Sequence, residues 1–505
     1  MKTPILGGAY TARSVNAADN RMVNLFPEIV PEGGKEPAFL QRCPGLELVA
    51  TVGEGPIRGL WKFGDFLYVA SGGKLYRVDG NFVATELGLI NGSGPVSMSD
   101  NGIQLFVACN PDAFIYNAST GVFAQVTDPD FPGAVSVGYL DGYFVFNEPN
   151  SQRVWVTSLL DGTAVDPLDF ASAEGNPDDI VSLVVDHREV WLFGNNTIEV
   201  WYNAGLADFP LARIEGAFME TGCLAPYSVA KLDNSVFWLG SDARGNGIVY
   251  RNKGYNAQRI STHAIEWQIQ QYGVLSDAIG YSYQQDGHSF YVLTFPTAQA
   301  TWVYDVATGL WHERAYWDGV QFRRHRSNCQ ANFAGKVLVG DWENYSLYEL
   351  DPQAYDDNGE AQRWLRSWRA LPAGQNNLKR TAHHTLQLDA ETGVGVGTVE
   401  NYFILSENNL FLTDELGNEL TTTSISLTTG ENPQVMLRWS DDGGHTWSNE
   451  HWASMGSIGQ YGKRILWRRL GMTTKLRDRV YEVSGSDPVK IAIMGAELAV
   501  TPTAA

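Results

Sequence analysis

The clearest chemical pattern in the sequence is a run of small polar residues and glycines near its C-terminal end. The run Ser440-Asp441-Asp442-Gly443-Gly444-His445-Thr446-Trp447 matches the Asp-box form Ser-x-Asp-x-Gly-x-x-Trp. In this form the aspartate accepts backbone N–H groups of a tight hairpin, glycine supplies a positive φ, and the tryptophan covers the turn. The pattern therefore predicts a structural turn built on Ser440, Asp442, Gly444 and Trp447.

An enzymatic interpretation of this motif is the alternative. Asp-boxes recur in the propellers of sialidases, where several copies accompany three clustered arginines and a nucleophilic tyrosine. This chain has one copy, and the copy lies outside the repeating part of the sequence. A carbohydrate-active or carbohydrate-binding propeller is therefore the second hypothesis for function, behind a structural role.

Paired carboxylates could supply a general acid and a general base. Asp128 with Asp130, and Asp178 with Asp179, are such pairs, but they lie in proline-rich turns where solvated carboxylates are ordinary. We therefore predict no catalytic residue, and the chain is not expected to be an enzyme.

Metal and phosphate sites are also poorly supported. The neighbours His383 and His384 point to opposite faces of a strand, which makes a shared metal ion improbable. The glycine run 393–397 is followed by neither a helix nor a Lys-Ser/Thr pair, so it predicts a hairpin end, not a phosphate loop. No cofactor and no metal are predicted.

The four cysteines, Cys43, Cys109, Cys223 and Cys329, are far apart and form no Cys-x-x-Cys pair. A disulfide framework and a zinc knuckle are therefore unsupported. We expect small buried thiols.

Basic residues gather in three runs, at residues 323–326, 363–369 and 463–469. They fit either an ordinary cationic surface or contact with an acidic protein partner, because arginine and tryptophan are favoured at interfaces. Strand alternation predicts that Arg464 and Arg468 share one face of the last run, with Arg469 on the other. The candidate interface residues are Arg323, Arg324, Arg326, Arg363, Arg366, Lys463, Arg464, Arg468 and Arg469.

The elements that carry these residues are predicted to be strands, because no long amphipathic helix can be found. Apolar runs followed by turns recur roughly forty to fifty residues apart, the length of a four-stranded propeller blade. Seven such runs begin at Phe66, Leu105, Tyr143, Val190, Val236, Phe290 and Lys336.

The predicted fold is all-β, with an irregular β-propeller of six or seven blades followed by a β-sandwich or barrel. Residues 1–52 are expected to form an N-terminal arm with extra strands, 53–355 the propeller and 356–505 the C-terminal domain. The turn-rich stretch 356–360 marks the second boundary, since the repeat ends there.

Composition excludes several classes of protein. The 505 residues are 44% hydrophobic and 18% charged, which is typical of a folded chain. With 36 basic and 57 acidic residues the net charge is -21, which argues against a protein that grips nucleic acid. No apolar run is long enough for a membrane helix or a signal peptide, so we expect synthesis in a cytosol.

Two segments resemble a known family. They are residues 191–201, which read Trp-Leu-Phe-Gly-Asn-Asn-Thr-Ile-Glu-Val-Trp, and residues 463–471, which read Lys-Arg-Ile-Leu-Trp-Arg-Arg-Leu-Gly. Weaker matches include residues 42–46 and 220–223. These matches occur in the same order along the chain as in the tail-hub or nozzle proteins of short-tailed bacteriophages, also called packaged-DNA stabilisation proteins, which the chain resembles. Residues 395–430 depart from that pattern, and we expect them to add strands.

The resemblance implies a structural virion component made in the host bacterial cytoplasm. Such proteins form a ring, usually of six copies, below the portal and its adaptor or head-to-tail connector. The ring retains packaged DNA and later forms the conduit for ejection. It also meets tailspikes or tail fibres and a needle or plug protein, and double-stranded DNA passes through it without tight binding.

The charge distribution agrees with such a conduit. Residues 1–355 carry 22 basic and 39 acidic side chains, and residues 356–505 carry 14 and 18. Acidic walls repel the DNA backbone and leave the duplex mobile. We therefore expect part of the charge of the arm and propeller to face the lumen of a ring.

Overall fold

The computed structural model describes all residues except 14–18, 31–33, 35, 174, 176–177, 207–208, 244, 373–379, 396–397, 404–420, 427–429, 474–478 and 503–505. It divides into two compact units, each described below by itself. One unit is Gly45–Pro352. The other joins Met1–Pro44 to Gln353–Ala505.

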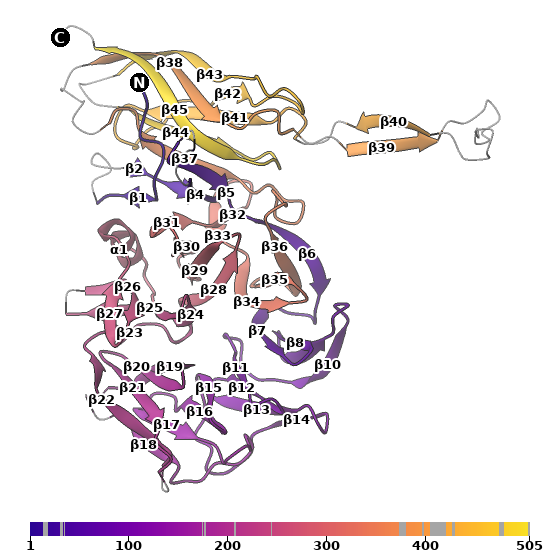
Figure 1. Cartoon of the computed structure of the whole chain (residues 1–505), viewed down its shortest axis with the longest axis vertical. Coiled ribbons are helices and arrows are strands. Elements are labelled where there is room, and N and C mark those ends of the chain that lie inside the picture. The colour runs from indigo at the N-terminus through magenta and orange to yellow at the C-terminus, as the bar shows by residue number, and fades with distance from the viewer. Residues whose placement is uncertain are drawn as a thin grey trace. The chain divides into compact units, whose positions relative to one another are not determined.

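The unit Gly45–Pro352 is built from seven antiparallel sheets, which follow one another along the chain (Figure 1). Blade 1 comprises β7 (Ile57–Phe63), β8 (Phe66–Ser71), β9 (Lys74–Val78) and β10 (Ala84–Leu89). Blade 2 comprises β11 (Ser97–Asp100), β12 (Gln104–Cys109), β13 (Asp112–Asn117) and β14 (Val122–Gln125). Blade 3 comprises β15 (Val137–Leu140), β16 (Tyr143–Asn147), β17 (Arg153–Val156) and β18 (Phe170–Ser172).

The next three blades repeat this plan. Blade 4 comprises β19 (Ile180–Asp186), β20 (Glu189–Gly194), β21 (Ile198–Asn203) and β22 (Leu211–Met219). Blade 5 comprises β23 (Gly222–Cys223), β24 (Ala230–Leu232), β25 (Ser235–Asp242), β26 (Gly245–Lys253) and β27 (Asn256–Arg259), with β23 and β24 both paired to β25. Blade 6 comprises β28 (Ile279–Gln285), β29 (His288–Phe295), β30 (Ala300–Asp305) and β31 (Leu310–Glu313).

Blade 7 closes the ring of blades with a strand from the start of the unit. It comprises β34 (Ser327–Phe333), β35 (Lys336–Asp341), β36 (Ser346–Asp351) and β6 (Gly45–Thr51). In the register of β36 with β6, Leu350 lies opposite Leu46. The strand β6 therefore belongs to the propeller, although the sequence predicts residues 45–52 to be part of the N-terminal arm. The other boundary, between residues 352 and 353, lies close to the predicted one.

The seven predicted apolar runs are the second strands of the seven blades: β8, β12, β16, β20, β25, β29 and β35. Their side chains are buried on both faces because a neighbouring blade packs on each side. The ring of Phe106 lies 5.4 Å from that of Phe144 in the next blade, and Phe193 lies 5.5 Å from Trp238. This two-sided burial explains why these strands read as continuous apolar runs without polar alternation.

Three short elements lie within or between the blades. The 3-10 helix η1 (Pro226–Ser228) lies between β23 and β24, and the hairpin of β32 (Ala315–Trp317) and β33 (Phe322–Arg324) lies between blades 6 and 7. The helix α1 (His263–Gln270) follows blade 5. It begins at Thr262, whose hydroxyl accepts a hydrogen bond from the backbone N–H of Ile265.

The second unit is a β-sandwich of two antiparallel sheets. One sheet has the order β4 (Leu25–Ile29), β5 (Ala38–Arg42), β45 (Ala492–Pro502), β38 (Thr381–Ala390) and β43 (Ile465–Met472). The other has the order β3 (Met22–Val23), β37 (Trp364–Arg369), β44 (Val480–Gly485), β41 (Gln434–Ser440) and β42 (His451–Ser454). The N-terminal segment thus supplies strands to both sheets, and β1 (Tyr10–Thr11) pairs with β2 (Asp19–Asn20) beside them.

Hydrogen bonds join the two sheets of the sandwich. His383 Nδ1 on β38 lies 2.8 Å from the Tyr481 hydroxyl on β44, and Trp467 Nε1 on β43 donates to the His451 carbonyl at 2.9 Å. Trp364 and Trp368 fill the core at 1% and 0% exposure. Within the segment 395–430, β39 (Thr398–Phe403) pairs with β40 (Thr421–Ser426), and residues 404–420 lie outside the described part.

Candidate functional site

A central cavity of about 720 Å³ is lined by all seven blades. The lining strands are the first strands of the blades, together with η1: β7, β11, β15, β19, β24, β28 and β34. This volume is that of a small-molecule pocket.

Charged side chains on the cavity wall are held by neighbouring blades. Arg188 Nη2 lies 2.8 Å from both carboxylate oxygens of Asp141. Trp61 Nε1 donates to Asp100 at 2.8 Å, and Lys231 Nζ donates to the Val185 carbonyl at 3.1 Å. These contacts tie adjacent blades together, so the wall is a structural seam of the propeller.

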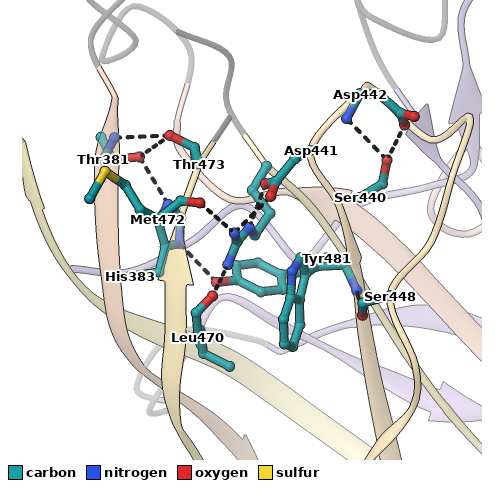
Figure 2. Close-up of polar contacts among 12 residues, drawn as sticks. Thr381, His383, Ser440, Asp441, Asp442, Ser448, Leu470, Met472, Thr473 and Tyr481 are labelled. Carbon is teal, nitrogen blue, oxygen red and sulfur yellow. Dashed lines mark hydrogen bonds and ion pairs between the residues drawn. The ribbon is translucent and has the colours of Figure 1, made fainter. Parts of the chain in front are cut away.

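The Asp-box turn follows β41 and is closed by side-chain and backbone hydrogen bonds (Figure 2). Asp442 Oδ1 accepts from the Ser440 hydroxyl at 2.6 Å and from the backbone N–H groups of His445 and Thr446, each at 2.9 Å. Ser440 Oγ accepts from the Gly444 N–H at 2.8 Å, with φ at +100° for Gly444. Hydrogen bonds from Ser440 and Thr446 hold the pKa of the Asp442 carboxyl well below its ordinary value.

The turn is anchored to the sandwich through Arg479, a residue that the sequence analysis did not single out. Its side chain is 1% exposed, and it donates from Nε to Asp441 Oδ1 at 2.7 Å and from Nη2 to Asp441 Oδ2 at 2.9 Å. It also donates to the carbonyls of Leu470 and Met472 at the end of β43. Asp441 occupies one of the unspecified positions of the Asp-box, so the motif carries no signal for this ion pair.

His383 and Tyr481 extend this cluster between the sheets (Figure 2). His383 Nε2 lies 3.0 Å from the Thr381 hydroxyl, and burial, with Arg479 and His384 nearby, lowers the pKa of His383 to about 3. The neighbouring His384 is exposed and contacts Thr501. The predicted opposite orientation of the two histidines is therefore confirmed. Within the described residues no group of three or more His, Cys, Asp or Glu side chains could hold a metal ion.

The candidate interface residues of the first basic run have three different environments. Arg323 is exposed and its Nε donates to Asp318 at 2.8 Å. Arg326 pairs with Glu343 at 3.0 Å and Asp341 at 3.4 Å. Arg324 is 7% exposed, and its guanidinium lies 3.8 Å from the centre of the Trp342 ring. Arg324 is thus unavailable for broad surface contact.

The second run is largely internal. Arg366 is 1% exposed, and its Nε donates to the Ile5 carbonyl at 2.7 Å. Burial lowers its pKa to about 10. Arg363 lies 3.4 Å from Glu450. The placement of Arg366 at a protein interface is wrong, because its donors satisfy carbonyls of the N-terminal segment within the same unit.

The third run is the exposed one. Lys463, Arg464, Arg468 and Arg469 are all exposed at β43, an edge strand of its sheet. The predicted alternation fails at Arg469, which has φ at +59° beside a register shift against β38. This irregularity brings Arg468 and Arg469 to solvent together. We call these four residues the cationic edge.

The remaining sequence candidates have structural environments. Asp178 Oδ2 accepts from the N–H groups of Asn196 and Thr197, and Asp128 Oδ1 accepts from the Asp130 N–H. Residues 396–397 of the glycine run lie outside the described part. All four cysteines are free, and three of them, Cys43, Cys109 and Cys223, are buried. Burial raises the pKa of Cys109 to about 12 and that of Cys223 to about 11.

Other buried arginines had no sequence signal. Arg58, 4% exposed, donates to the carbonyls of Gly94, Gly72 and Asn91 at 2.7 to 3.0 Å. Arg42, 3% exposed, donates to the carbonyls of Asp487 and Val489. Each joins chain segments through backbone acceptors, which the sequence does not reveal.

A β-propeller followed by a β-sandwich defines an all-β protein, in which the charged groups described above join neighbouring strands and blades. Residues 1–355 match the family described as Bacteriophage P22 Gp10, beta-propeller, and residues 401–501 match Bacteriophage P22 Gp10, beta-sandwich. The chain therefore belongs to the bacteriophage P22 Gp10 family, which confirms the resemblance seen in the sequence. The all-β fold prediction is confirmed as well.

One relative is the "Tail hub protein gp10" of Salmonella phage P22. It is 21% identical over 457 residues, which is 84% of this chain and 84% of the relative. This relationship supports a structural role in a phage tail hub, in assembly with other tail components. The relative is a phage tail protein. In the described part of this chain, no helix has the length and apolar character needed to cross a membrane.

Solved structures give weaker likenesses. The β-propeller domain of Cps50 (Swd1) from Myceliophteria thermophila is 8% identical with a TM-score of 0.39, covering 60% of this chain and 98% of that one. The extracellular domain of the putative one component system BT4673 from B. thetaiotaomicron is 12% identical with a TM-score of 0.42, covering 88% and 58%. At these values they carry no argument about function.

Proposed function

We propose that six copies of this chain form a closed ring in a phage tail, below the portal and its adaptor. The ring retains packaged DNA and later serves as the conduit for its ejection. Cyclic assembly needs heterologous contacts, in which one side of each copy complements a different side of its neighbour. The tail-hub relationship supports this proposal, and the strongest single observation for it is the charge distribution.

The acid is concentrated in the propeller. Residues 45–352 carry 17 basic and 35 acidic side chains, whereas residues 1–44 carry 5 and 4 and residues 353–505 carry 14 and 18. The N-terminal arm is therefore not acidic. The acidic surface that the sequence predicts for the arm and propeller together belongs to the propeller alone. A propeller of this charge repels the DNA backbone, which suits a duplex that must remain mobile.

We place the DNA path between copies and not through a propeller. The central cavity has the volume of a small-molecule pocket, about 720 Å³, and charged groups on its wall are engaged between blades. A lumen faced by the acidic propellers of several copies would provide the path. DNA would then pass transiently and without tight binding.

The proposed partners are the adaptor or head-to-tail connector, a tailspike or tail fibre, and a needle or plug protein. The cationic edge supports contact with an acidic surface, because its four side chains are exposed on the edge strand β43 or immediately before it. The chain would be synthesised in the host bacterial cytoplasm and incorporated into the virion tail.

Sedimentation velocity of the chain mixed with portal and adaptor proteins tests this function. We expect the chain alone to sediment as a monomer, and a ring complex to form with the adaptor, visible by negative-stain electron microscopy. Absence of any complex would overturn the tail-ring proposal. A neutral or basic lumen in the assembled ring would overturn the charge argument. Hydrolysis of sialosides by the purified chain would instead support the carbohydrate-active alternative.

A further inference from the structure

Arg324 lines a second cavity in the propeller unit, of about 320 Å³. This cavity adjoins the central one, since both are lined by Arg58, Pro95, Pro226, Tyr227, Ile279 and Asn328. These residues lie at or just before the start of first strands or in η1. The cavity is therefore at the end of the central channel where the first strands begin, and it is separate from the cationic edge.

The guanidinium of Arg324 is packed but makes no hydrogen bond to another described residue. It is 7% exposed and stacks 3.8 Å from the centre of the Trp342 ring. Its Nε atom has no partner among the described residues, and neither does Nε1 of Trp342. Both side chains line the cavity. Leaving donors unsatisfied in a buried position is costly, so a ligand that supplies acceptors would stabilise this site.

The cavity also holds an acceptor. Asp277 Oδ2 accepts from the Thr297 N–H at 2.8 Å, whereas Asp277 Oδ1 is buried without a partner in the described structure. Arg58, by contrast, already donates three hydrogen bonds to backbone carbonyls. The buried atoms without a partner are therefore two donors, Arg324 Nε and Trp342 Nε1, and one acceptor, Asp277 Oδ1.

The cavity is lined by two cationic side chains, Arg58 and Arg324, and by one carboxylate, Asp277, so its charge favours a negatively charged ligand. Burial lowers the pKa of Arg324 to about 10, and the charges of Asp277, Asp341 and Glu343 oppose that effect. The side chain is thus cationic at neutral pH. Its planar group matches a carboxylate, which can accept two parallel hydrogen bonds from it.

We propose that this cavity binds the carboxylate of an acidic residue carried by a protein segment. Arg324 supplies the main donors, Trp342 holds the guanidinium in its plane and adds a donor, and Asp277 Oδ1 accepts from an N–H of the same segment. The segment comes either from a second copy of this chain or from another tail protein. The proposal does not depend on the ring, because the cavity lies within one propeller.

The probe for this site is glutamate blocked as N-acetyl and amide, observed by saturation-transfer NMR with the full chain. Blocked glutamine, which has the same shape without the charge, is the matched ligand. We expect blocked glutamate to bind saturably and blocked glutamine to bind about tenfold or more weakly, as expected when a charge-assisted hydrogen bond is lost. Equal binding of the two, or stronger binding of inorganic phosphate, would overturn the carboxylate site.

Arg324→Met separates a ligand site from a structural arginine. We expect this variant to lose binding by about tenfold or more while its unfolding midpoint stays the same or rises, because a buried cation that makes no hydrogen bond is removed. Arg323→Met, on the exposed face of the same strand, is the control and should bind as the parent does. Unchanged binding by Arg324→Met, or its failure to fold, would overturn the proposal.

Trp342→Phe is a milder variant, since it keeps an aromatic ring under Arg324 and removes only the indole donor. We expect weaker binding with normal folding, and full binding would contradict the role of Trp342. Sedimentation velocity then distinguishes the source of the carboxylate. Self-association that blocked glutamate or Arg324→Met abolishes identifies a second copy, whereas a chain that binds glutamate but stays monomeric indicates another tail protein.

Discussion

Arg479 and Asp441 form a two-point ion pair in the sandwich, with Nε to Oδ1 at 2.7 Å and Nη2 to Oδ2 at 2.9 Å (Figure 2). The Arg479 side chain is 1% exposed, and that of Asp441 is 20% exposed. The pair connects the Asp-box turn to the carbonyls at the end of β43. The Asp-box turn, which is the clearest motif in the sequence, therefore has a structural role and helps to hold the sandwich together.

Asp441→Asn should destabilise the sandwich by about 3 kcal/mol, because it leaves the buried Arg479 charge without its counter-ion. Urea unfolding followed by tryptophan fluorescence measures the change. Glu391→Gln is the control, since Glu391 pairs with Lys490 at 2.9 Å with both side chains about half exposed. That change should cost no more than about 0.5 kcal/mol. Similar losses of unfolding free energy in the two variants would contradict a stabilising role of the Arg479–Asp441 pair.

His383→Asn should make the free energy of unfolding depend less on pH under acidic conditions. The folded pKa of His383 is about 3, below the ordinary value of 6.5, so between these values only the unfolded chain binds the proton. The free energy of unfolding therefore falls as pH decreases below 6.5, by about 1.4 kcal/mol per pH unit from this group. The variant lacks this contribution.

Urea unfolding of parent and variant at about pH 7 and about pH 5.5 tests this, with a slope expected from proton linkage. Thr385→Ser on the same strand is the control, because it replaces no titrating group. The expected result is that the stability difference between parent and His383→Asn narrows at the lower pH. A constant difference would contradict a neutral buried His383.

Leu46→Ala should destabilise the propeller by about 2–5 kcal/mol, because Leu46 is 1% exposed and faces Leu350 across the closing strand pair. Leu48→Ala on the same strand is the matched control, since Leu48 is 43% exposed. That change should alter stability by about 0.5 kcal/mol or less. Thermal unfolding of both variants measures the difference, and equal midpoints would show that β6 does not close the propeller.

The sequence predicts most of the propeller because the second strand of each blade is buried on both faces. Runs such as the one at Phe106 are therefore apolar throughout and repeat with the blade. The closing strand β6 was missed because only part of it is buried, as Leu46 and the exposed Leu48 show, and because its partner lies about three hundred residues away. Hydrophobic periodicity reports local burial and carries no information about distant pairing.

The candidate interface was less predictable, since identical side chains have different environments. Arg323 and Arg324 are neighbours, yet the first is exposed and the second stacks on Trp342. Arg366 is buried because the carbonyls of the N-terminal segment accept its hydrogen bonds. Backbone acceptors have no sequence signature, so the burial of an arginine depends on tertiary structure.

Reversing charge on the cationic edge tests its role in assembly. The double variant Lys463→Glu with Arg464→Glu should fold normally, because both side chains are exposed, and should lose association with an acidic partner surface. Lys62→Glu with Lys253→Glu is the matched control, since it makes the same change in net charge at exposed positions of the propeller.

Sedimentation velocity with the adaptor measures complex formation at low and high salt. Because interfacial charges act through complementary potentials, the parent complex should weaken with salt and the edge variant should not form it. Equal assembly of the two double variants would show that net charge, and not the cationic edge, sets association.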